Sequence, residues 1–263
     1  MRPRRDDSFF CALYSPRATE RNPPLASEPV RTQFVDCRWV LGEPERGREL
    51  YLEGHVPGAS FLDVDRDLSD LSVRGAGRHP LPGADAFAAA ASRAGIGDGV
   101  LAVAYGTMGG PERLWWLLRH FGHEDCAVLV GGLDVWGGPL RGGDEEVEPA
   151  EFVPRERADD VISAEEILAG RDSLVVVDAR TPNRWRGEPN PIDDPPGRIP
   201  GALNAPWEEP LPDLPAGELV AYCGSGVTAC VVLHRASLHG RDGKLYPGSW
   251  SEWGGRGLPL ERG

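Results

Sequence analysis

One cysteine stands where a strand, a glycine-spaced loop and a helix follow one another. Cys223 comes directly after the apolar run Leu219–Tyr222, and Gly224 and Gly226 precede the segment 227–239, which has a helical pattern. Ligands of open α/β sheets bind at the carboxyl ends of strands, where this cysteine falls. Two glycines permit a tight curl whose backbone N–H groups surround an anion at a helix N-terminus. Such a loop favours the thiolate form, which is the nucleophile.

Two chemistries use a cysteine loop of this kind. Cysteine phosphatases need an arginine six positions after the cysteine to clamp the phosphate, and this chain has Ala229 there. Phosphatase activity and arsenate reduction are therefore disfavoured. Sulfur transfer remains, with the loop holding a sulfane sulfur on Cys223.

The other cysteines have no comparable setting. They are Cys11, Cys37, Cys126 and Cys230. An odd count without a CxxC pair fits neither a disulfide framework nor a zinc site, so we predict no metal. Cys37, Cys126 and Cys230 are expected to be core residues.

Four motifs occur twice in the same order, which predicts two copies of one domain. The pairs are Phe34–Arg38 with Val176–Arg180, Gly54–Ala59 with Gly197–Ala202, Val103–Gly106 with Val220–Cys223, and Gly132–Gly138 with Ser249–Gly255. In this alignment Gly106 takes the place of Cys223, so only the second copy has the nucleophile. The first copy also has an additional helix, expected at 84–94, where the second has the proline-rich loop 207–215.

Short apolar runs alternate with helical segments in both copies, which predicts an α/β fold. We expect two tandem domains, each a mainly parallel sheet flanked by helices. The predicted boundaries are 1–30 for an unstructured extension, 31–140 for an inactive N-terminal domain, 141–159 for a linker, and 160–263 for a catalytic C-terminal domain.

Charge and composition exclude several classes of function. The 263 residues carry a net charge of −13, which argues against binding to nucleic acid or to an anionic membrane. No apolar run approaches the ~18 residues of a membrane span. We therefore predict a cytoplasmic protein.

These motifs together resemble the tandem-domain rhodanese-type sulfurtransferases, most of all the 3-mercaptopyruvate sulfurtransferase branch. The matching segments are Asp36–Trp39, Gly54–Asp65, Arg113–Gly122, Gly131–Trp136, Asp178–Glu188, Gly197–Trp207, Cys223–Ala229 and Leu245–Trp253. The resemblance implies an inactive first domain, an active second domain and a site in the cleft between them. The loop carries Gly224 and Ser225, where thiosulfate-preferring members usually have basic residues.

The resemblance also implies roles for particular residues. Arg184 matches an arginine that binds the donor's carboxylate or sulfonate, and a planar guanidinium suits that task. Ser225, His79 and Asp65 match a group placed beside the catalytic cysteine, where a Ser–His–Asp relay could move protons. The remaining loop residues, expected to bind the donor, are Gly224, Gly226, Val227 and Thr228. The alternatives are a surface salt bridge for Arg184 and a structural role for His79 in a loop near a domain interface.

The implied function is transfer of sulfane sulfur from 3-mercaptopyruvate through a Cys223 persulfide to cyanide, a thiol or thioredoxin, with no cofactor. The alternatives are thiosulfate as the donor, or a non-catalytic module that binds a partner protein. One departure concerns the second donor-binding arginine of the mercaptopyruvate branch. The loop 188–196 contains none, and whether Arg186 or Arg198 replaces it stays open.

Overall fold

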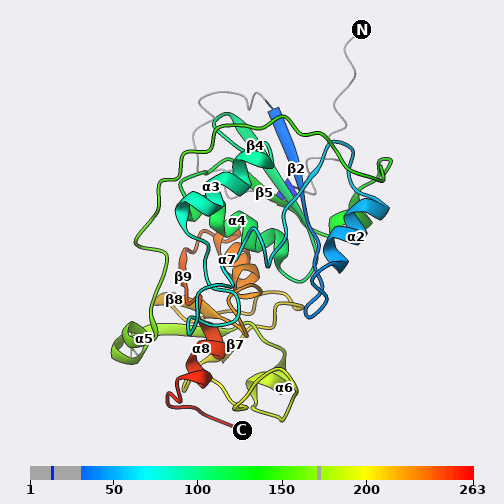
Figure 1. Ribbon diagram of the computed structural model, residues 1–263. Helices are drawn as coiled ribbons and strands as arrows, with labels where there is room; N and C mark the ends of the chain where they lie inside the picture. The colour runs from blue at the N-terminus through cyan, green and yellow to red at the C-terminus, as the bar shows by residue number, and fades with distance from the viewer. Residues whose placement is uncertain (1–12, 15–30, 171–172) are drawn as a thin grey trace.

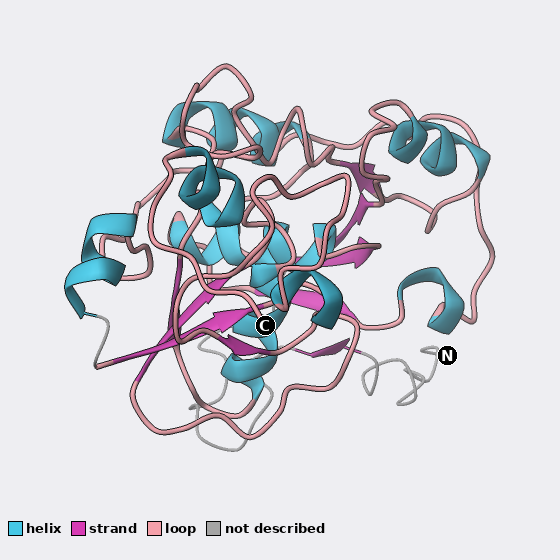
Figure 2. Cartoon of the chain, turned by 90° about the horizontal axis from the view of Figure 1, so that it is seen from below, coloured by secondary structure: helices cyan, strands magenta, loops and turns pink. Residues whose placement is uncertain are grey.

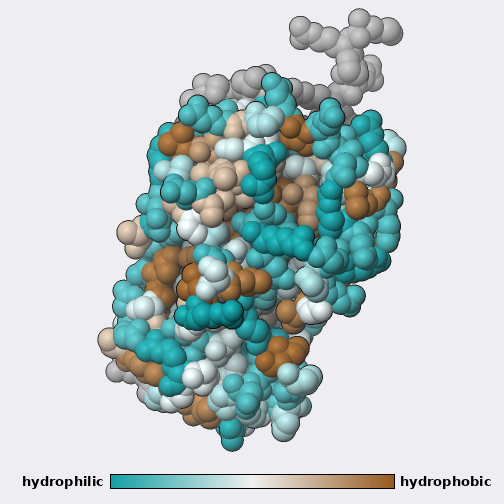
Figure 3. Space-filling model, viewed as in Figure 1, coloured by the Kyte–Doolittle hydropathy of each residue, from teal (hydrophilic) through white to brown (hydrophobic). Residues whose placement is uncertain are grey.

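The computed structural model describes residues 13–14, 31–170 and 173–263. They form two sheets, one in each half of the chain, with the N-terminal half above the C-terminal half in Figure 1. Figure 2 shows the strands running through the middle of the molecule with helices around them. The surface seen in Figure 3 is mostly hydrophilic, with hydrophobic residues in separate groups.

The N-terminal sheet has the strand order β1-β5-β4-β2-β3, and its pairs are parallel except for β1 with β5. Its strands are β1 (Leu13–Tyr14), β2 (Arg31–Cys37), β3 (Ser60–Phe61), β4 (Val100–Gly106) and β5 (Cys126–Leu129). Its helices are α2 (Arg46–Glu53), α3 (Ala84–Arg93), α4 (Gly110–His120) and the 3-10 turn η2 (Gly132–Val135).

The C-terminal sheet is parallel throughout, in the order β7-β6-β8-β9. Its strands are β6 (Leu174–Asp178), β7 (Leu203–Asn204), β8 (Glu218–Tyr222) and β9 (Gly243–Leu245). Its helices are α5 (Ala164–Gly170), α6 (Pro182–Trp185), α7 (Ala229–Leu238) and α8 (Ser249–Gly255). The predicted fold class, two mainly parallel sheets flanked by helices, is confirmed.

The sequence repeat is also a repeat of contacts. In the first half the Arg38 guanidinium donates to Asp36 at 2.6–3.0 Å, just after β2. In the second half Arg180 makes the same contacts with Asp178, at the same distances, just after β6. Each arginine thus satisfies a carboxylate buried at the end of a strand, as hydrogen bonding of buried charges requires. The Asp178–Arg180 pair therefore serves the structure of the strand end.

The two halves differ between the second and third repeated motifs. The alanine-rich segment forms α3, one residue shorter than predicted, and its Phe87, Ala90 and Ala91 face the core. The matching segment 207–215 contains no helix or strand, since its prolines remove backbone donors. The C-terminal half therefore has no counterpart of α3 in segment 207–215.

The segments outside the two sheets bear on the predicted boundaries. Leu13–Tyr14, inside the predicted extension, forms β1, and the rest of 1–30 lies outside the described residues. Residues 142–160 contain no helix or strand. This segment follows the N-terminal half, where Glu145 accepts a hydrogen bond from the Gly58 N–H and the Arg155 N–H donates to the Phe121 carbonyl. The domain boundaries themselves remain a prediction.

The halves share one apolar core. Helix α4 of the first packs against α7 of the second, between the two sheets (Figure 1). Buried Trp115 makes an edge contact with His234, with ring centroids 4.8 Å apart. The largest cluster of buried apolar residues includes Leu114 of the first half and Leu233 of the second half. This contact brings the end of β8 close to loops of the N-terminal half.

Candidate functional site

Cys223 lies just beyond β8, at the carboxyl end of the sheet, with 1% of its surface exposed. The Gly226 N–H donates to its Sγ at 3.1 Å. The loop 224–228 then leads into α7, so the sulfur lies near the start of this helix. A backbone N–H directed at the sulfur and a nearby helix start both favour negative charge there.

Two residues with left-handed backbone hold the loop in shape. Gly226 has φ +86°, and a Cβ there would lie 2.6 Å from the Pro247 carbonyl oxygen. Ser249, at the start of α8, has φ +51°, which is uncommon for a residue with a side chain. Its hydroxyl accepts a hydrogen bond from the Cys223 N–H at 3.1 Å and donates to the Tyr246 carbonyl at 2.9 Å. Sequence reasoning missed Ser249.

The same place in the N-terminal half cannot hold a cysteine. A Cβ added to Gly106 would lie 2.6 Å from the carbonyl carbon of Cys37 and 2.8 Å from the Arg38 nitrogen. Gly132, the counterpart of Ser249, has φ +55° and no hydroxyl. The first copy therefore keeps the backbone of the loop and lacks both the sulfur and the room for it.

Two guanidinium groups converge on Gly224. A Cβ at Gly224 would lie 2.7 Å from Nη2 of Arg184 and 2.7 Å from Nη2 of Arg78. Arg184 comes from α6 of the C-terminal half, whereas Arg78 comes from a loop of the N-terminal half. The absence of a side chain at Gly224 lets both cations approach the cysteine loop. Arg184 is predicted from the sequence, whereas Arg78 is not.

Arg184 already has a carboxylate partner. Its Nε and Nη2 donate to the two oxygens of Asp193 at 2.7 Å each, and Arg180 donates to the same carboxylate at 3.1 Å. Burial would raise the pKa of Asp193, but hydrogen bonds from Arg184 and the charges around it hold that pKa below its usual value. The planar fork of Arg184 thus binds a carboxylate in the bidentate way expected for a donor.

His79 and Asp65 are paired as the resemblance implies. His79 Nε2 and Asp65 Oδ1 are 2.9 Å apart, and His79 is 5% exposed. Its Nδ1 is buried and has no hydrogen-bond partner in the described part of the chain. Ser225 is also buried, but among the described residues no hydrogen bond joins it to His79. The structure therefore shows two members of the expected relay in contact and the third unconnected.

Arg113 links His79 to the cysteine loop. This fully buried side chain from α4 donates to the carbonyls of Leu68 at 3.3 Å, His79 at 3.1 Å and Gly226 at 3.3 Å. Burial lowers the pKa of Arg113, while the nearby sulfurs of Cys230 and Cys223 raise it. In the sequence Arg113 is only the first residue of a matching family segment, Arg113–Gly122, and its contact with the cysteine loop is not predicted. A buried cation that binds carbonyls rather than carboxylates leaves a positive charge near the nucleophile.

The last two predicted loop residues, Val227 and Thr228, precede α7. Val227 is 1% exposed, and its carbonyl accepts a hydrogen bond from the Cys230 N–H. Thr228 precedes α7, and a Cβ at Gly109 would lie 3.1 Å from its Cα. Both residues therefore position the loop against the N-terminal half.

The remaining described cysteines lie in the core, as predicted for Cys37, Cys126 and Cys230. Burial raises the pKa of Cys230 to about 12 and that of Cys37 well above its usual value, so both stay protonated at neutral pH. Cys11 lies outside the described residues.

Neither arginine considered for the second donor contact lies at the loop. Arg186 is exposed and pairs with Glu188 at 2.8 Å. Arg198 pairs with Glu261 and stacks over the Trp185 ring at 4.2 Å. Both side chains therefore make contacts within the C-terminal half, away from the cysteine loop.

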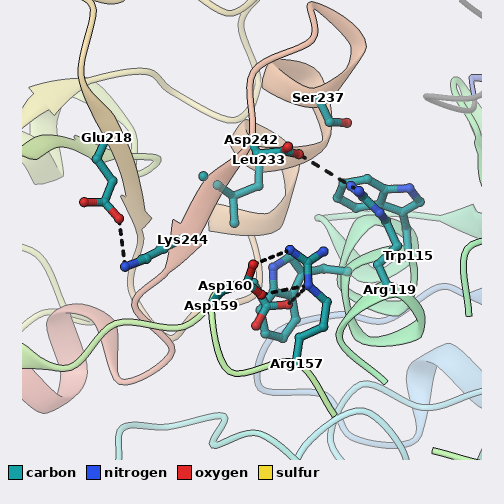
Figure 4. A pocket seen from close by; sticks show the side chains of 12 residues that line it. Trp115, Arg119, Arg157, Asp159, Asp160, Glu218, Leu233, Ser237, Asp242 and Lys244 are labelled. Carbon is teal, nitrogen blue, oxygen red and sulfur yellow. Dashed lines mark hydrogen bonds and ion pairs between the residues drawn. The ribbon is translucent and has the colours of Figure 1, made fainter. Parts of the chain in front are cut away.

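A cavity of about 240 Å³ lies between the halves at the other end of the sheet (Figure 4). Glu218 and Gly243, which line it, begin β8 and β9, whereas Cys223 follows the end of β8. Its charged side chains pair with one another, as Lys244 does with Glu218 at 2.7 Å. It is therefore separate from the cysteine site.

Two findings concern other kinds of site. Among the described residues, no group of three or more His, Cys, Asp and Glu side chains could hold a metal ion. In the same ranges, none of the helices combines the length and apolar character that crossing a bilayer demands.

Comparison with known proteins agrees with this geometry. The rhodanese-like domain family matches twice, over residues 24–138 and 163–256. Human 3-mercaptopyruvate sulfurtransferase is 37% identical, covering 90% of this chain and 89% of its own. Mycobacterium tuberculosis SseB, provisionally named a thiosulfate sulfurtransferase, is 37% identical, covering 87% and 89%.

A solved structure gives the same result. The crystal structure of the Escherichia coli 3-mercaptopyruvate sulfurtransferase SseA aligns with a TM-score of 0.71 and 31% identity, covering 84% of this chain and 93% of that one. Two matched copies of the family domain and relatives similar over nearly the whole length show that this chain belongs to the rhodanese-like family, as a tandem-domain member.

Proposed function

We propose that this protein is a sulfurtransferase that takes sulfane sulfur from 3-mercaptopyruvate and carries it as a persulfide on Cys223. One observation carries the proposal: the Cys223 sulfur, just after β8, lies in a loop that two guanidinium groups approach. The sulfur accepts a hydrogen bond from the Gly226 N–H, and Arg78 and Arg184 converge on Gly224 beside it. A nucleophile and two anion-binding groups at one point suit a small anionic sulfur donor.

The first step would be attack of the Cys223 thiolate on the donor sulfur. A sulfur–sulfur bond forms and the sulfur–carbon bond breaks, so the electron pair goes to carbon as the enolate of pyruvate. That enolate takes a proton, and we propose that His79, whose Nε2 lies 2.9 Å from Asp65 Oδ1, supplies it. The Gly226 N–H stabilises the charge on the Cys223 sulfur.

The second step would return the cysteine to its starting form. A thiolate acceptor attacks the outer sulfur of the persulfide, and the bond between the two sulfurs breaks with its electron pair on Cys223. We propose a thiol such as that of thioredoxin, or cyanide in an assay, as the acceptor. We propose a cytoplasmic setting, where such a thiol acceptor stays reduced.

Entry of the donor requires the side chains above the loop to move. Cys223 is 1% exposed, and the Arg184–Asp193 pair lies beside Gly224. A donor carboxylate can replace Asp193 as the partner of Arg184, because both offer two oxygens to the same fork. Such an exchange would uncover the sulfur while it binds the donor.

Thiosulfate is the second candidate donor, because a relative 37% identical to this chain is provisionally named for it. With thiosulfate, sulfite would leave in place of the pyruvate enolate. The decisive measurement compares kcat/KM for the two donors on one preparation, and the proposal predicts a higher value for 3-mercaptopyruvate. A higher value for thiosulfate would reverse the order of the candidates.

The persulfide itself is tested by mass spectrometry. After treatment with 3-mercaptopyruvate, Cys223 should carry one additional sulfur atom, and Cys223→Ser should abolish transfer. Cys126→Ser is the matched control, since Cys126 is buried away from the loop and should affect stability at most. Turnover by Cys223→Ser, or a protein that gains no sulfur from either donor, would refute the assignment.

A further inference from the structure

Arg78 belongs to the N-terminal half but is fixed against the C-terminal half. Its backbone N–H donates to the Ser251 hydroxyl at 3.0 Å. The preceding Gly77 has φ +91°, and a Cβ there would lie 2.5 Å from the Gly248 carbonyl oxygen. The glycine lets the loop reach the start of α8, so Arg78 is placed over the cysteine loop by close backbone packing.

The Arg78 guanidinium has unused hydrogen-bonding capacity. Its Nη1 donates to the Ile192 carbonyl at 3.0 Å, and its Nη2 lies at Gly224 opposite Arg184. Its Nε is buried and has no hydrogen-bond partner in the structure as described. A buried N–H without a partner is costly, so such a group points to an acceptor that arrives with a ligand.

The charge around Gly224 also lacks an anion. Around the cysteine loop Arg78, Arg113, Arg180 and Arg184 contribute four positive charges, and Asp178, Asp193 and the proposed Cys223 thiolate contribute three negative ones, which leaves one positive charge in excess. The two carboxylates pair with Arg180 and Arg184, whereas Arg78 has no ion pair within 4.0 Å among the described residues. A monocarboxylate donor would supply the missing charge.

We propose that Arg78 binds the anionic group of the sulfur donor, opposite Arg184, and so acts as the second donor-binding arginine of this site. The inference rests on the proposed function and specifies its donor-binding residues. It also accounts for the loop 188–196, which has no arginine. The Ile192 carbonyl in that loop instead holds a guanidinium supplied by the other half of the chain.

The test uses the full chain with Arg78→Ala and Arg78→Lys, and Arg74→Ala as the matched control, because Arg74 is an exposed arginine of the same loop. For 3-mercaptopyruvate we expect KM to rise about tenfold or more in Arg78→Ala, with a smaller change in kcat, as loss of a charged hydrogen bond implies. Arg78→Lys should recover part of the loss, and Arg74→Ala should match the wild type.

A second measurement separates binding from turnover. Pyruvate is used as the probe in calorimetry with the Cys223→Ser protein, alone and combined with Arg78→Ala. Weaker pyruvate binding in the double variant supports the inference. If KM and pyruvate binding are unchanged while the melting temperature falls, Arg78 only joins the two halves and the inference is wrong. Failure of the proposed function would look different, because wild-type Cys223 would then gain no sulfur.

Discussion

At the level of single residues, the site contains an internal carboxylate that resembles part of its proposed donor. Asp193 occupies the fork of Arg184 with both oxygens at 2.7 Å, and its pKa is below the usual value, so it is charged at neutral pH. This pair makes Arg184 both a structural residue and a donor-binding candidate. The alternatives for Arg184 from sequence, a salt bridge or a substrate contact, therefore do not exclude each other.

Arg184→Lys tests the donor contact. A lysine offers a single point charge where the guanidinium offers two parallel donors. We therefore expect kcat/KM for 3-mercaptopyruvate to fall by a factor that corresponds to about 1–3 kcal/mol of lost transition-state stabilisation. The matched control is Arg186→Lys, whose arginine is exposed and pairs only with Glu188 among the described residues. Unchanged kinetics in Arg184→Lys would mean that Arg184 serves Asp193 alone.

His79→Ala tests proton supply. Breaking a sulfur–carbon bond leaves an enolate that needs a proton, whereas sulfite leaves thiosulfate without that need. We expect a loss of about a hundredfold with 3-mercaptopyruvate, the lower end of general acid–base effects, and a clearly smaller loss with thiosulfate. Asp65→Asn, which weakens the partner of His79, should show the same donor dependence. Equal losses with both donors would assign His79 to the structure of the loop.

At the level of elements, the sequence predicted what depends on local pattern. The strand before Cys223, the glycine curl and the helix after it follow from apolar runs and turn residues, and the helix differs from its predicted start only because Val227 and Thr228 still belong to the loop. Arg78 could not be predicted in this way. Its role depends on a backbone contact between Gly77 and Gly248, residues far apart in the sequence.

The same limit applies to Ser249. The repeat aligns it with Gly132, and both have a left-handed backbone, so the comparison of copies contained a signal. A serine in a conformation that favours glycine is strained, and its hydroxyl bond to the Cys223 N–H explains why it is there. The signal is readable only once the backbone angles are known.

The cysteine loop can be tested as an element by replacing Gly224-Ser225 with Arg-Lys. The two guanidinium groups lie 2.7 Å from the position of a Cβ at Gly224, so a side chain there must displace Arg78 and Arg184 while adding charge. We expect the ratio of kcat/KM values to shift towards thiosulfate, a compact dianion, by about tenfold, as one charged contact implies. Gly224→Ala displaces the arginines without new charge. If it gives the same shift, crowding rather than charge sets the donor preference.

At the level of the whole molecule, the site is assembled from both halves. Cys223 and Arg184 come from the C-terminal half, and Arg78, His79 and Arg113 from the N-terminal half. The copy without a cysteine thus supplies side chains to the copy that has one. Arg113 connects them directly, because its guanidinium donates both to the His79 carbonyl and to the Gly226 carbonyl.

The last prediction follows from this division and from the shared core. Residues 156–263 produced alone would expose the face of α7 that packs on α4, including Leu233, which belongs to the cluster running through both halves. Exposure of such a face promotes aggregation. The fragment would also lack Arg78, His79 and Arg113. We therefore expect its kcat/KM for 3-mercaptopyruvate to be lower by about a hundredfold or more, the scale of a lost positioning group.

Co-expression with residues 1–155 provides the control, because it restores the missing side chains without a covalent link. Sulfur transfer should return in part, and the restored activity should disappear again when the added fragment carries Arg113→Leu, which leaves the Gly226 carbonyl without its cross-domain donor. A lone C-terminal fragment with wild-type kcat/KM would show that the N-terminal half contributes nothing to the chemistry. Its guanidinium groups at the loop would then serve only to hold the two domains together.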